Sequence, residues 1–272
     1  MRKISAFIFV LGVINSINFV SAQRLTDHDT VSFIDYAPDE PDSIIQQRIS
    51  LIDSDLEIVF NSKVRGFINY FSIRNRDYTR KLLSRQTAYF PMFEKMLKKH
   101  DMPDALKYLT VVESAINPVA QSPAGALGLW QFMPATGKMY HLHYDGYKDE
   151  RMDPEKSTEA ACLYLKSLHG MFNDWEMALA AYSCGPGNVR RAIRRSGYKK
   201  TFWGIYKYLP KETRSYVPQF MAVNYVMRYG PEHNLQPDYN DVLTPSDTII
   251  INQYTNLEGF AEHIGVCHDD LV

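Results

Sequence analysis

The sequence predicts a mainly α-helical protein. Apolar residues recur at spacings of three and four through most of the chain from Ile44 to Gly230, which places them on one side of a helix. Helix-start signals such as Asp153-Pro154-Glu155, and stops such as Gly230-Pro231, divide this region into segments. The run TIII at residues 248–251 is typical of a strand. We therefore expect a helical main domain with an N-terminal helical extension and a short C-terminal α/β tail.

Length and charge narrow the class of protein. A chain of 272 residues with 45% hydrophobic content can bury a sizeable core, which fits one main domain with appendages. The formal net charge is -1, so no overall electric field favours nucleic acid as a partner.

The N-terminus has the pattern of a secretory signal peptide. Arg2 and Lys3 precede an apolar run over residues 6–14, and small residues at 20–22 offer a cleavage site before Gln23. The run is too short to predict a membrane span, although an uncleaved anchor stays an alternative. We therefore expect residues 1–22 to be a signal peptide of an exported protein, located in the periplasm or cell envelope, with peripheral envelope association.

Residues 23–64 are expected to form an N-terminal leader and helix. Residues 23–43 are polar and contain Pro38 and Pro41, which predicts little regular structure. Helical spacing begins at Ile44. Further on, the stretch from Tyr78 to His100 predicts one long helix, which Pro91 can kink.

A short helix is expected to lead into an uncharged stretch. It begins near Pro103-Asp104 and ends at Asn117-Pro118, so Glu113 falls in its last turn. The segment ESAINPVAQSPAGALGLWQFMPATG, residues 113–137, contains no charged residue other than Glu113. This isolated acid is the first candidate for chemistry.

Further helices follow the uncharged stretch. Ser122-Pro123 and Met133-Pro134 are typical of helix starts with proline in the first turn. Asp153-Pro154-Glu155 opens a longer helix, and Asp174 caps the next one, which the GPG at residues 185–187 ends. The segment KETRSYVPQFMAVNYVMRYG at 211–230 predicts the last long helix of the main domain.

Glu113 has the local chemistry of a general acid. The free carbonyl groups at the end of a helix disfavour a charged carboxylate, and apolar neighbours desolvate it. A carboxylic acid that stays protonated near neutral pH can donate a proton in catalysis. The same local features also fit an ordinary exposed glutamate at a helix end, so they leave both interpretations open.

Three separated motifs resemble the soluble-lytic-transglycosylase family, whose lysozyme-like domain cleaves peptidoglycan. The first is the segment at 113–137. The others are DERMDPEKSTEAACLYLKSLHGMFNDWEMALAAYSCGPGNV at 149–189 and FWGIYKYLPKETRSYVPQFMA at 202–222. Their order agrees with the family, and the resemblance covers roughly residues 65–230, which it implies are the catalytic domain.

The resemblance implies roles for individual residues. It makes Glu113 the catalytic acid and base, and it places the hydroxyl of Tyr182 near that carboxylate. The other implied substrate-binding residues are Ser122 near the reacting sugar, Gln131 and Met133 in the groove, and Glu212 and Tyr216 in the cleft wall. Ser183 departs from the family, which usually has Asn after that tyrosine.

The resemblance also implies a reaction. The enzyme would cleave the β-1,4 bond between N-acetylmuramic acid and N-acetylglucosamine in peptidoglycan glycan strands and form 1,6-anhydromuramyl ends. Most glycosidases use two carboxylates about 5–10 Å apart, whereas here Glu113 would act first as acid and then as base. No metal or cofactor is implied. The alternatives are a goose-type muramidase, which delivers water instead, and a catalytically silent cell-wall-binding domain.

Other charged and polar clusters have structural explanations. The acids between Asp145 and Glu155 fit loop and helix-cap positions. His141 and His143 have no nearby cluster with metal-ligand spacing. A disulfide between Cys162 and Cys184 is not expected, because nothing in the sequence brings them into bonding range. The basic set fits a solvated helix face, with anionic stem peptides as the alternative partner; it comprises Arg190, Arg191, Arg194, Arg195, Lys199 and Lys200.

Residues 231–272 are expected to form a linker and a tail. The segment that starts at Ser246 resembles the beginning of a LysM-type glycan-binding module, with a strand followed by a helix around residues 256–265. We expect a partial LysM-like module here.

Overall fold

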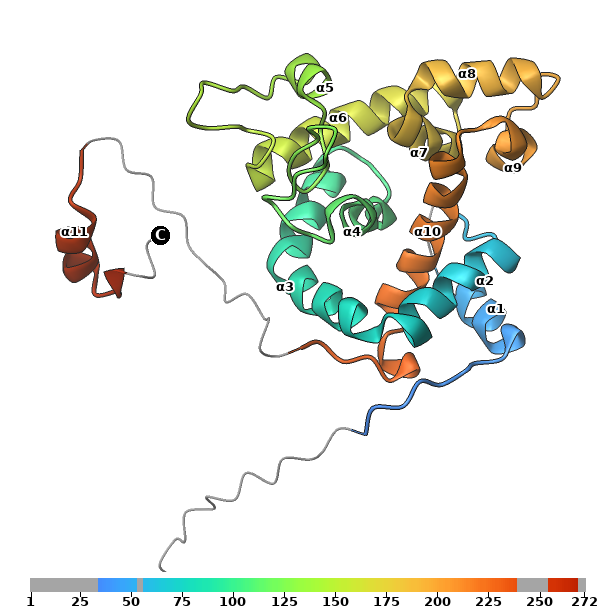
Figure 1. Cartoon of the computed structure of the whole chain (residues 1–272), viewed down its shortest axis with the longest axis horizontal. Helices are drawn as coiled ribbons and strands as arrows, with labels where there is room; N and C mark the ends of the chain where they lie inside the picture. The colour runs from blue at the N-terminus through green and yellow to red at the C-terminus, as the bar shows by residue number, and fades with distance from the viewer. Residues whose placement is uncertain (1–33, 53–55, 239–253, 269–272) are drawn as a thin grey trace, which may run out of the picture. The chain divides into compact units, whose positions relative to one another are not determined.

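The computed structural model describes residues 34–52, 56–238 and 254–268, and these are mainly helical (Figure 1). The predicted fold class is therefore confirmed. Within the described ranges, extended pairing is limited to isolated bridges such as the one between Leu127 and Phe132. The predicted strand at 248–251 and the predicted signal peptide lie outside the described residues. None of the described helices is both long enough and apolar enough to cross a membrane.

The N-terminal part contains three helices that lead toward the core. Helix α1 (Asp42–Ser50) precedes α2 (Ser62–Asn69), whose first turn is capped by the side chain of Asn61. Helix α2 continues into a π-helical turn, η1 (Tyr70–Arg74), and α3 (Arg76–Lys99) follows. Helix α3 runs through Pro91 as one element, so the long helix predicted here is confirmed and starts at Arg76.

The segment that leads to Glu113 differs from the single helix predicted for residues 103–117. It starts as a 3-10 helix, η2 (Asp104–Tyr108), and only α4 (Leu109–Ser114) is α-helical. The helix ends earlier than predicted because Ala115 and Ile116 both have left-handed backbones, with φ of 55° and 56°. Glu113 lies in the last turn, as predicted.

A long loop separates α4 from α5 (Pro134–Met139). The helix predicted at Ser122-Pro123 is wrong. Ser122 instead closes a turn: its N–H donates to the Ala126 carbonyl, and its hydroxyl accepts from the Ala126 N–H. The start predicted at Met133-Pro134 is confirmed by α5. Gly128 passes so close to the Arg151 carbonyl that a Cβ would lie 1.9 Å from its oxygen, which excludes any larger residue.

The remaining helices confirm the predicted caps. Asp153 caps α6 (Pro154–Phe172), and Asp174 caps α7 (Trp175–Cys184). Gly185 ends α7, and Pro186 at once begins α8 (Pro186–Arg195). The rest of the chain contains α9 (Phe202–Ile205), η3 (Tyr206–Tyr208), α10 (Lys211–Arg228), η4 (Pro231–His233) and α11 (Leu257–Ile264).

Helix α10 is the centre of the core. It packs against α2, α4 and α7, which come from three separate parts of the chain (Figure 1). Trp130 from the loop after α4 is completely buried, and its ring meets Phe93 of α3 edge-on at 5.6 Å. The three cysteines are free thiols. Helix α11 confirms the helix predicted in the C-terminal tail.

Candidate active site

The backbone around Glu113 is fixed by hydrogen bonds from several elements. The hydroxyl of Ser114 contacts the carbonyls of Thr110 and Leu129 at 3.0 and 2.9 Å, which joins α4 to the following loop. Arg85 of α3 donates to the Ala115 carbonyl at 3.0 Å. These contacts hold the left-handed turn that follows Glu113, and so they fix the direction in which its side chain leaves α4.

Tyr216 is the direct partner of Glu113. Its hydroxyl donates to Oε1 of Glu113, which joins the end of α4 to α10. Both side chains are partly buried. Burial raises the pKa of Glu113 to about 7, and the hydrogen bond from Tyr216 offsets part of that effect. Within the described part of the chain, no cation forms an ion pair with Glu113. The raised pKa agrees with the direction predicted from its uncharged surroundings.

Tyr182 lies in the same cluster but has a different partner. Its hydroxyl donates to the Trp130 carbonyl at 2.7 Å. Burial, followed by the nearby charge of Glu113, raises the pKa of both Tyr182 and Tyr216 well above the usual range. Both phenols therefore stay protonated donors at neutral pH. The family resemblance implies that the Tyr182 hydroxyl lies near the carboxylate, and the charge of Glu113 does act on it. The hydrogen bond to Glu113, however, comes from Tyr216.

Two further tyrosine rings extend this cluster in tilted contacts. The ring of Tyr164 on α6 lies 5.2 Å from that of Tyr182 and 5.1 Å from that of Tyr140. Neither Tyr164 nor Tyr140 is predicted from the sequence to be a site residue. Tyr164 is four residues after Ala160 in a helix, so its spacing is indistinguishable from that of an ordinary core residue.

Two of the residues predicted to bind the sugar, Gln131 and Ser122, form hydrogen bonds within the loop between α4 and α5. The Gln131 side-chain amide donates to the carbonyls of Ala120 and Gly128 at 3.0 and 2.9 Å, and its φ is 48°. Met133, at the N-cap of α5, is 42% exposed and is available for contact. The hydroxyl of Ser122 accepts a hydrogen bond from the Ala126 N–H within the turn. Any contact of these residues with a sugar stays a prediction.

The predicted cleft-wall residues differ in exposure. Glu212 is exposed one helical turn before Tyr216, whose hydroxyl binds Glu113. Ser183, where the family usually has Asn, lies 3.2 Å from the Thr213 hydroxyl, so a polar contact between α7 and α10 is present at this position. The departure from the family therefore leaves this pair of helices linked.

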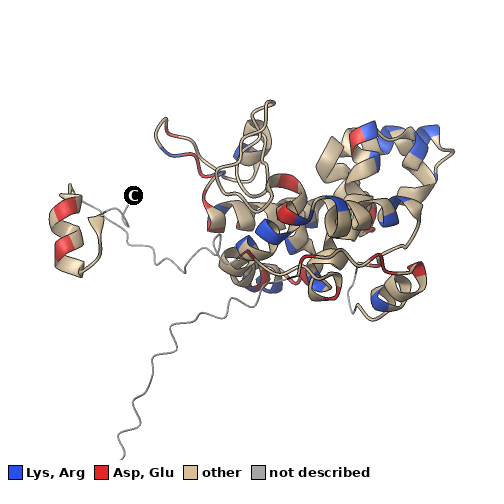
Figure 2. Ribbon diagram, turned by 60° about the horizontal axis from the view of Figure 1, so that its bottom comes forward, with Lys and Arg blue, Asp and Glu red and all other residues tan. Residues whose placement is uncertain are grey.

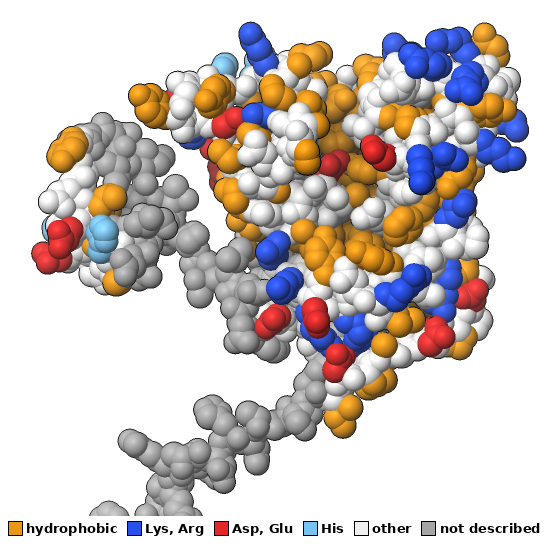
Figure 3. Space-filling model, in the orientation of Figure 1, with side chains coloured by type: hydrophobic (Ala, Val, Ile, Leu, Met, Phe, Trp, Pro, Cys, Tyr) orange, Lys and Arg blue, Asp and Glu red, His pale blue; other side chains and the backbone are white. Residues whose placement is uncertain are grey.

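The surface shows where a chain-like ligand has room. Figure 3 shows a recess between the part of the molecule that carries α5 and the part that carries α8 and α9, with hydrophobic side chains along it. Basic side chains gather on α8 (Figure 2), where all four arginines are exposed and Val189 and Ala192 are buried. This arrangement is that of a solvated helix face, as the sequence predicted.

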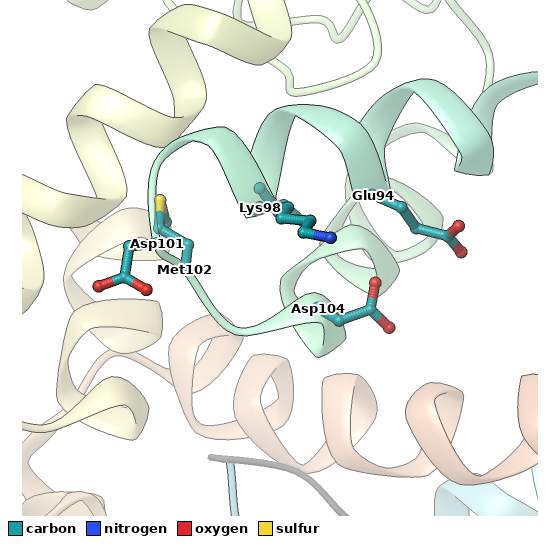
Figure 4. Close-up of a pocket in the computed structure, with 6 residues that line it drawn as sticks. Glu94, Lys98, Asp101, Met102 and Asp104 are labelled. Carbon is teal, nitrogen blue, oxygen red and sulfur yellow. The ribbon is translucent and has the colours of Figure 1, made fainter.

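A separate pocket lies where α3 turns into η2 (Figure 4). It is lined by Glu94, Leu97, Lys98, Asp101, Met102 and Asp104. Lys107 binds two of these acids, with Nζ 2.6 Å from Glu94 and 2.7 Å from Asp104. Lys107 thus neutralises Glu94 and Asp104, and Asp101 is the third acid that lines the pocket. Among the described residues, no group of three His, Cys, Asp or Glu side chains is arranged to hold a metal ion.

Comparison with known proteins identifies the central part of the chain. Residues 90–203 match the family model for the transglycosylase SLT domain. Membrane-bound lytic murein transglycosylase D of Escherichia coli (strain K12) is 37% identical over 166 residues, which cover 58% of this chain and 36% of that protein. Soluble lytic murein transglycosylase of the same strain is 31% identical over 149 residues, which cover 52% of this chain and 23% of that protein. The chain thus spans about a third or less of these relatives in length.

Solved structures of lytic transglycosylases also resemble the chain. An inactive variant of lytic transglycosylase Slt from Pseudomonas aeruginosa has a TM-score of 0.44 and 25% identity, covering 57% of this chain and 26% of that chain. The 70-kDa soluble lytic transglycosylase from Escherichia coli has a TM-score of 0.46 and 24% identity, covering 77% and 40%. The family match and the relatives' sequences agree with the resemblance seen in the three motifs: residues 90–203 of this chain are similar to a transglycosylase SLT domain.

Proposed function

We propose that this protein is an exported peptidoglycan lytic transglycosylase with Glu113 as its acid and base. It cleaves the β-1,4 bond between N-acetylmuramic acid and N-acetylglucosamine and leaves 1,6-anhydromuramyl ends. The observation that carries the proposal is Glu113 itself. It lies within the SLT domain, its pKa is raised to about 7, and it accepts a hydrogen bond from an uncharged tyrosine.

In the first half of the reaction, Glu113 acts as the acid. At a pH close to 7, about half of the molecules carry the proton on this carboxyl group. The proton passes to the oxygen that joins the two sugars, and the bond from that oxygen to the muramyl anomeric carbon breaks. The N-acetylglucosamine side leaves with a hydroxyl group, and Glu113 is left ionised.

In the second half, Glu113 acts as the base. It removes the proton of the muramyl 6-hydroxyl, whose oxygen forms a bond to the anomeric carbon. The carboxyl group is thereby restored, and no water is consumed. The Tyr216 hydroxyl stabilises the ionised form of Glu113 between the two steps and adds no charge. A positively charged partner would instead hold Glu113 ionised throughout the reaction.

The surroundings of Glu113 support a mechanism with one carboxylate. In the described part of the chain no second carboxylate is hydrogen-bonded in the Glu113 cluster, and Glu212 is exposed on the neighbouring turn of α10. The muramyl N-acetyl group, or an oxocarbenium-like state, takes the place that a second acid occupies in most glycosidases.

The proposal includes the organisation of the whole chain. Residues 1–22 are a signal peptide, 23–64 a leader and helix, 65–230 the catalytic domain, and 231–272 a linker with a partial LysM-like module. The SLT match at 90–203 lies inside the proposed catalytic domain. Export places the enzyme where its substrate is, in the periplasm or cell envelope, with peptidoglycan strands as its partner.

Mass spectrometry of digested peptidoglycan tests this proposal. We expect the wild-type protein to release muropeptides with 1,6-anhydromuramyl ends, and Glu113→Gln to release none while keeping its helical circular-dichroism spectrum. Reducing muramyl ends would instead identify a goose-type muramidase. Binding to sacculi without any released muropeptide, by a folded wild-type protein, would identify a silent wall-binding domain.

A further inference from the structure

A second pocket lies on another face of α10 and contains unpaired cations. It has a volume of about 480 Å³, within the range of roughly 300–1,000 Å³ that is usual for ligand pockets. Its charged residues are Lys63, Arg74 and Arg214, and none of the described residues that line it is acidic. Phe67, Tyr70 and Tyr206 supply aromatic surface beside them. The pocket therefore combines positive charge with rings.

Two helices build this pocket from neighbouring faces. On α2 and η1, Lys63 and Phe67 are one turn apart, as are Gly66 and Tyr70, so a single stripe faces the pocket. On α10, Arg214 and Pro218 are likewise one turn apart. Because α2 and α10 pack side by side, the two stripes meet.

The three cations have no acidic partner in the parts of the chain that the structure describes. Arg65, on the same helix as Lys63, forms ion pairs with Asp39 and Asp42 at 3.1 and 2.8 Å. Lys63, by contrast, lies over the Tyr206 ring, with Nζ 5.2 Å from the ring centre. The Nε of Arg214 is buried and has no hydrogen-bond partner. A buried donor without a partner is costly.

Gly66 keeps the floor of the pocket open. Glycine inside a helix costs about 1 kcal/mol relative to alanine, so a packing or functional reason is expected. Packing gives none, because a Cβ at Gly66 would have no neighbour within 4 Å. The glycine instead leaves space between Lys63 and Tyr70 that a ligand backbone can enter.

The pocket and the proposed active site share α10. Tyr216, which binds Glu113, and Glu212 are one turn apart on one face of this helix. Arg214 and Pro218 are offset from that pair by two residues, about 200° around the helix, and so lie on the opposite face. A peptide carried by a strand bound at Glu113 would have to extend around α10 to reach the pocket.

We propose that this pocket binds the carboxylates of the peptide side chains that peptidoglycan strands carry. The inference rests on the proposed function, since it assigns a recognition site for that substrate. Charge complementarity supports it: these peptides carry several carboxylates, and the pocket supplies three cations, while none of the described residues that line it is acidic. The aromatic rings and the open floor at Gly66 accept the peptide backbone and its apolar atoms.

Chemical conversion of the peptide carboxylates to amides tests this site. We compare kcat/KM on peptide-bearing glycan strands before and after that conversion, for the wild type and for the double variant Lys63→Glu, Arg74→Glu. Both side chains are exposed, so the fold should tolerate the change. The wild type should lose roughly tenfold on amidation, and the double variant should start roughly tenfold lower and lose little more. The matched control is Lys81→Glu, Lys95→Glu, which makes the same charge change at exposed positions of α3.

A filled pocket gives a second test that does not alter charge. Gly66→Gln should stabilise α2 yet lower kcat/KM on peptide-bearing strands, because the new side chain occupies the floor. A merely structural role for Gly66 predicts higher stability and unchanged kcat/KM. Full sensitivity of the Lys63→Glu, Arg74→Glu variant to amidation, or an equal loss in the control variant, would also overturn the proposal.

A binding measurement separates failure of this site from failure of the proposed function. A soluble stem tetrapeptide with free carboxylates is titrated into the full chain by NMR, which needs no cleavage. We expect shifts on α2 and α10 that disappear in the Lys63→Glu, Arg74→Glu variant. If the wild type cleaves strands but the tetrapeptide causes no such shifts, the pocket proposal is wrong. If the shifts are present and no strand is cleaved, the proposed function is wrong.

Discussion

Two partly buried glutamates in this protein have a pKa that burial raises, yet only one lies in a candidate active site. Burial raises the pKa of Glu113 and of Glu176 to about 7 in each case. Glu113 is in the last turn of α4 and accepts a hydrogen bond from Tyr216. Glu176 is in the first turn of α7, where the nearby negative charge of Asp174 raises its pKa further.

This difference between Glu113 and Glu176 shows that a raised pKa does not by itself identify a catalytic acid. An acid that must also act as a base needs a partner that stabilises its ionised form, and Tyr216 supplies this for Glu113. At Glu176 the neighbouring charge of Asp174 opposes ionisation more strongly than the contact with Trp203 favours it. The family resemblance assigns the catalytic role to Glu113, whereas it assigns none to Glu176, which lies in the second motif.

The largest effect expected is a difference in catalytic rate between variants of the two glutamates. Glu113→Gln should lower the rate of anhydromuropeptide release by about 10²–10⁴-fold, because glutamine cannot transfer the proton. Glu176→Gln should leave that rate unchanged. Initial rates of muropeptide release by both variants decide the matter. Equal losses in the two variants would show that burial, and not position, selects the acid.

The next effect concerns the hydroxyl that distinguishes Glu113. Tyr216→Phe should lower the rate by roughly 10–100-fold, the value of a hydrogen bond to a charged group. It should also raise the pKa of Glu113, because the bond from Tyr216 lowers that pKa in the wild type. Glu113 must be protonated to act as the acid, so activity falls as the pH rises through this pKa. The alkaline limb of the pH–rate profile should therefore move to higher pH.

Tyr182→Phe is the matched control for that variant. It removes a phenol of the same cluster whose hydroxyl binds the Trp130 carbonyl and not Glu113. We expect a modest loss of stability and an alkaline limb at the wild-type pH. A shift of the limb in Tyr182→Phe, without one in Tyr216→Phe, would reverse the roles of the two tyrosines.

The smallest effect is shared by both glutamates and concerns stability. A pKa raised from 4.5 to about 7 means that the folded protein holds a proton that the unfolded chain releases. The contribution of each of these glutamates to the free energy of unfolding is therefore highest below pH 4.5 and falls as the pH rises toward 7. Glu113→Gln and Glu176→Gln should each remove this loss, by about 1–3 kcal/mol at alkaline pH. Urea unfolding at acidic and alkaline pH measures it, and an unchanged pH dependence would contradict burial as the cause.

The sequence predicted most of the helices and the position of Glu113, because these depend on local signals. Proline and aspartate at helix starts, together with a spacing of three to four, located α3, α6, α7 and α10. The same local signal failed at Ser122-Pro123, where the side chain closes a turn with Ala126. A serine before a proline fits both a helix cap and a turn, and only the packing of the loop decides between them.

The partners of Glu113 depend on contacts between distant parts of the chain, and sequence patterns do not determine these. Tyr216 is far from Glu113 in sequence, and its bond to the acid follows from the packing of α10 against α4. The family resemblance assigned Tyr216 to the cleft and gave Tyr182 the place near the acid. The arginine pocket beside α10 left no motif at all, because Lys63, Arg74 and Arg214 come from separate segments.

The most direct test of the central claim is an NMR titration of the Glu113 side-chain carboxyl carbon in the free protein, with Glu113→Gln used to assign its signal. The account predicts a pKa of about 7 for Glu113 in the wild type and a higher value in Tyr216→Phe. A Glu113 pKa close to the ordinary value of 4.5 would contradict it, because the carboxyl group would then carry no proton to donate at neutral pH.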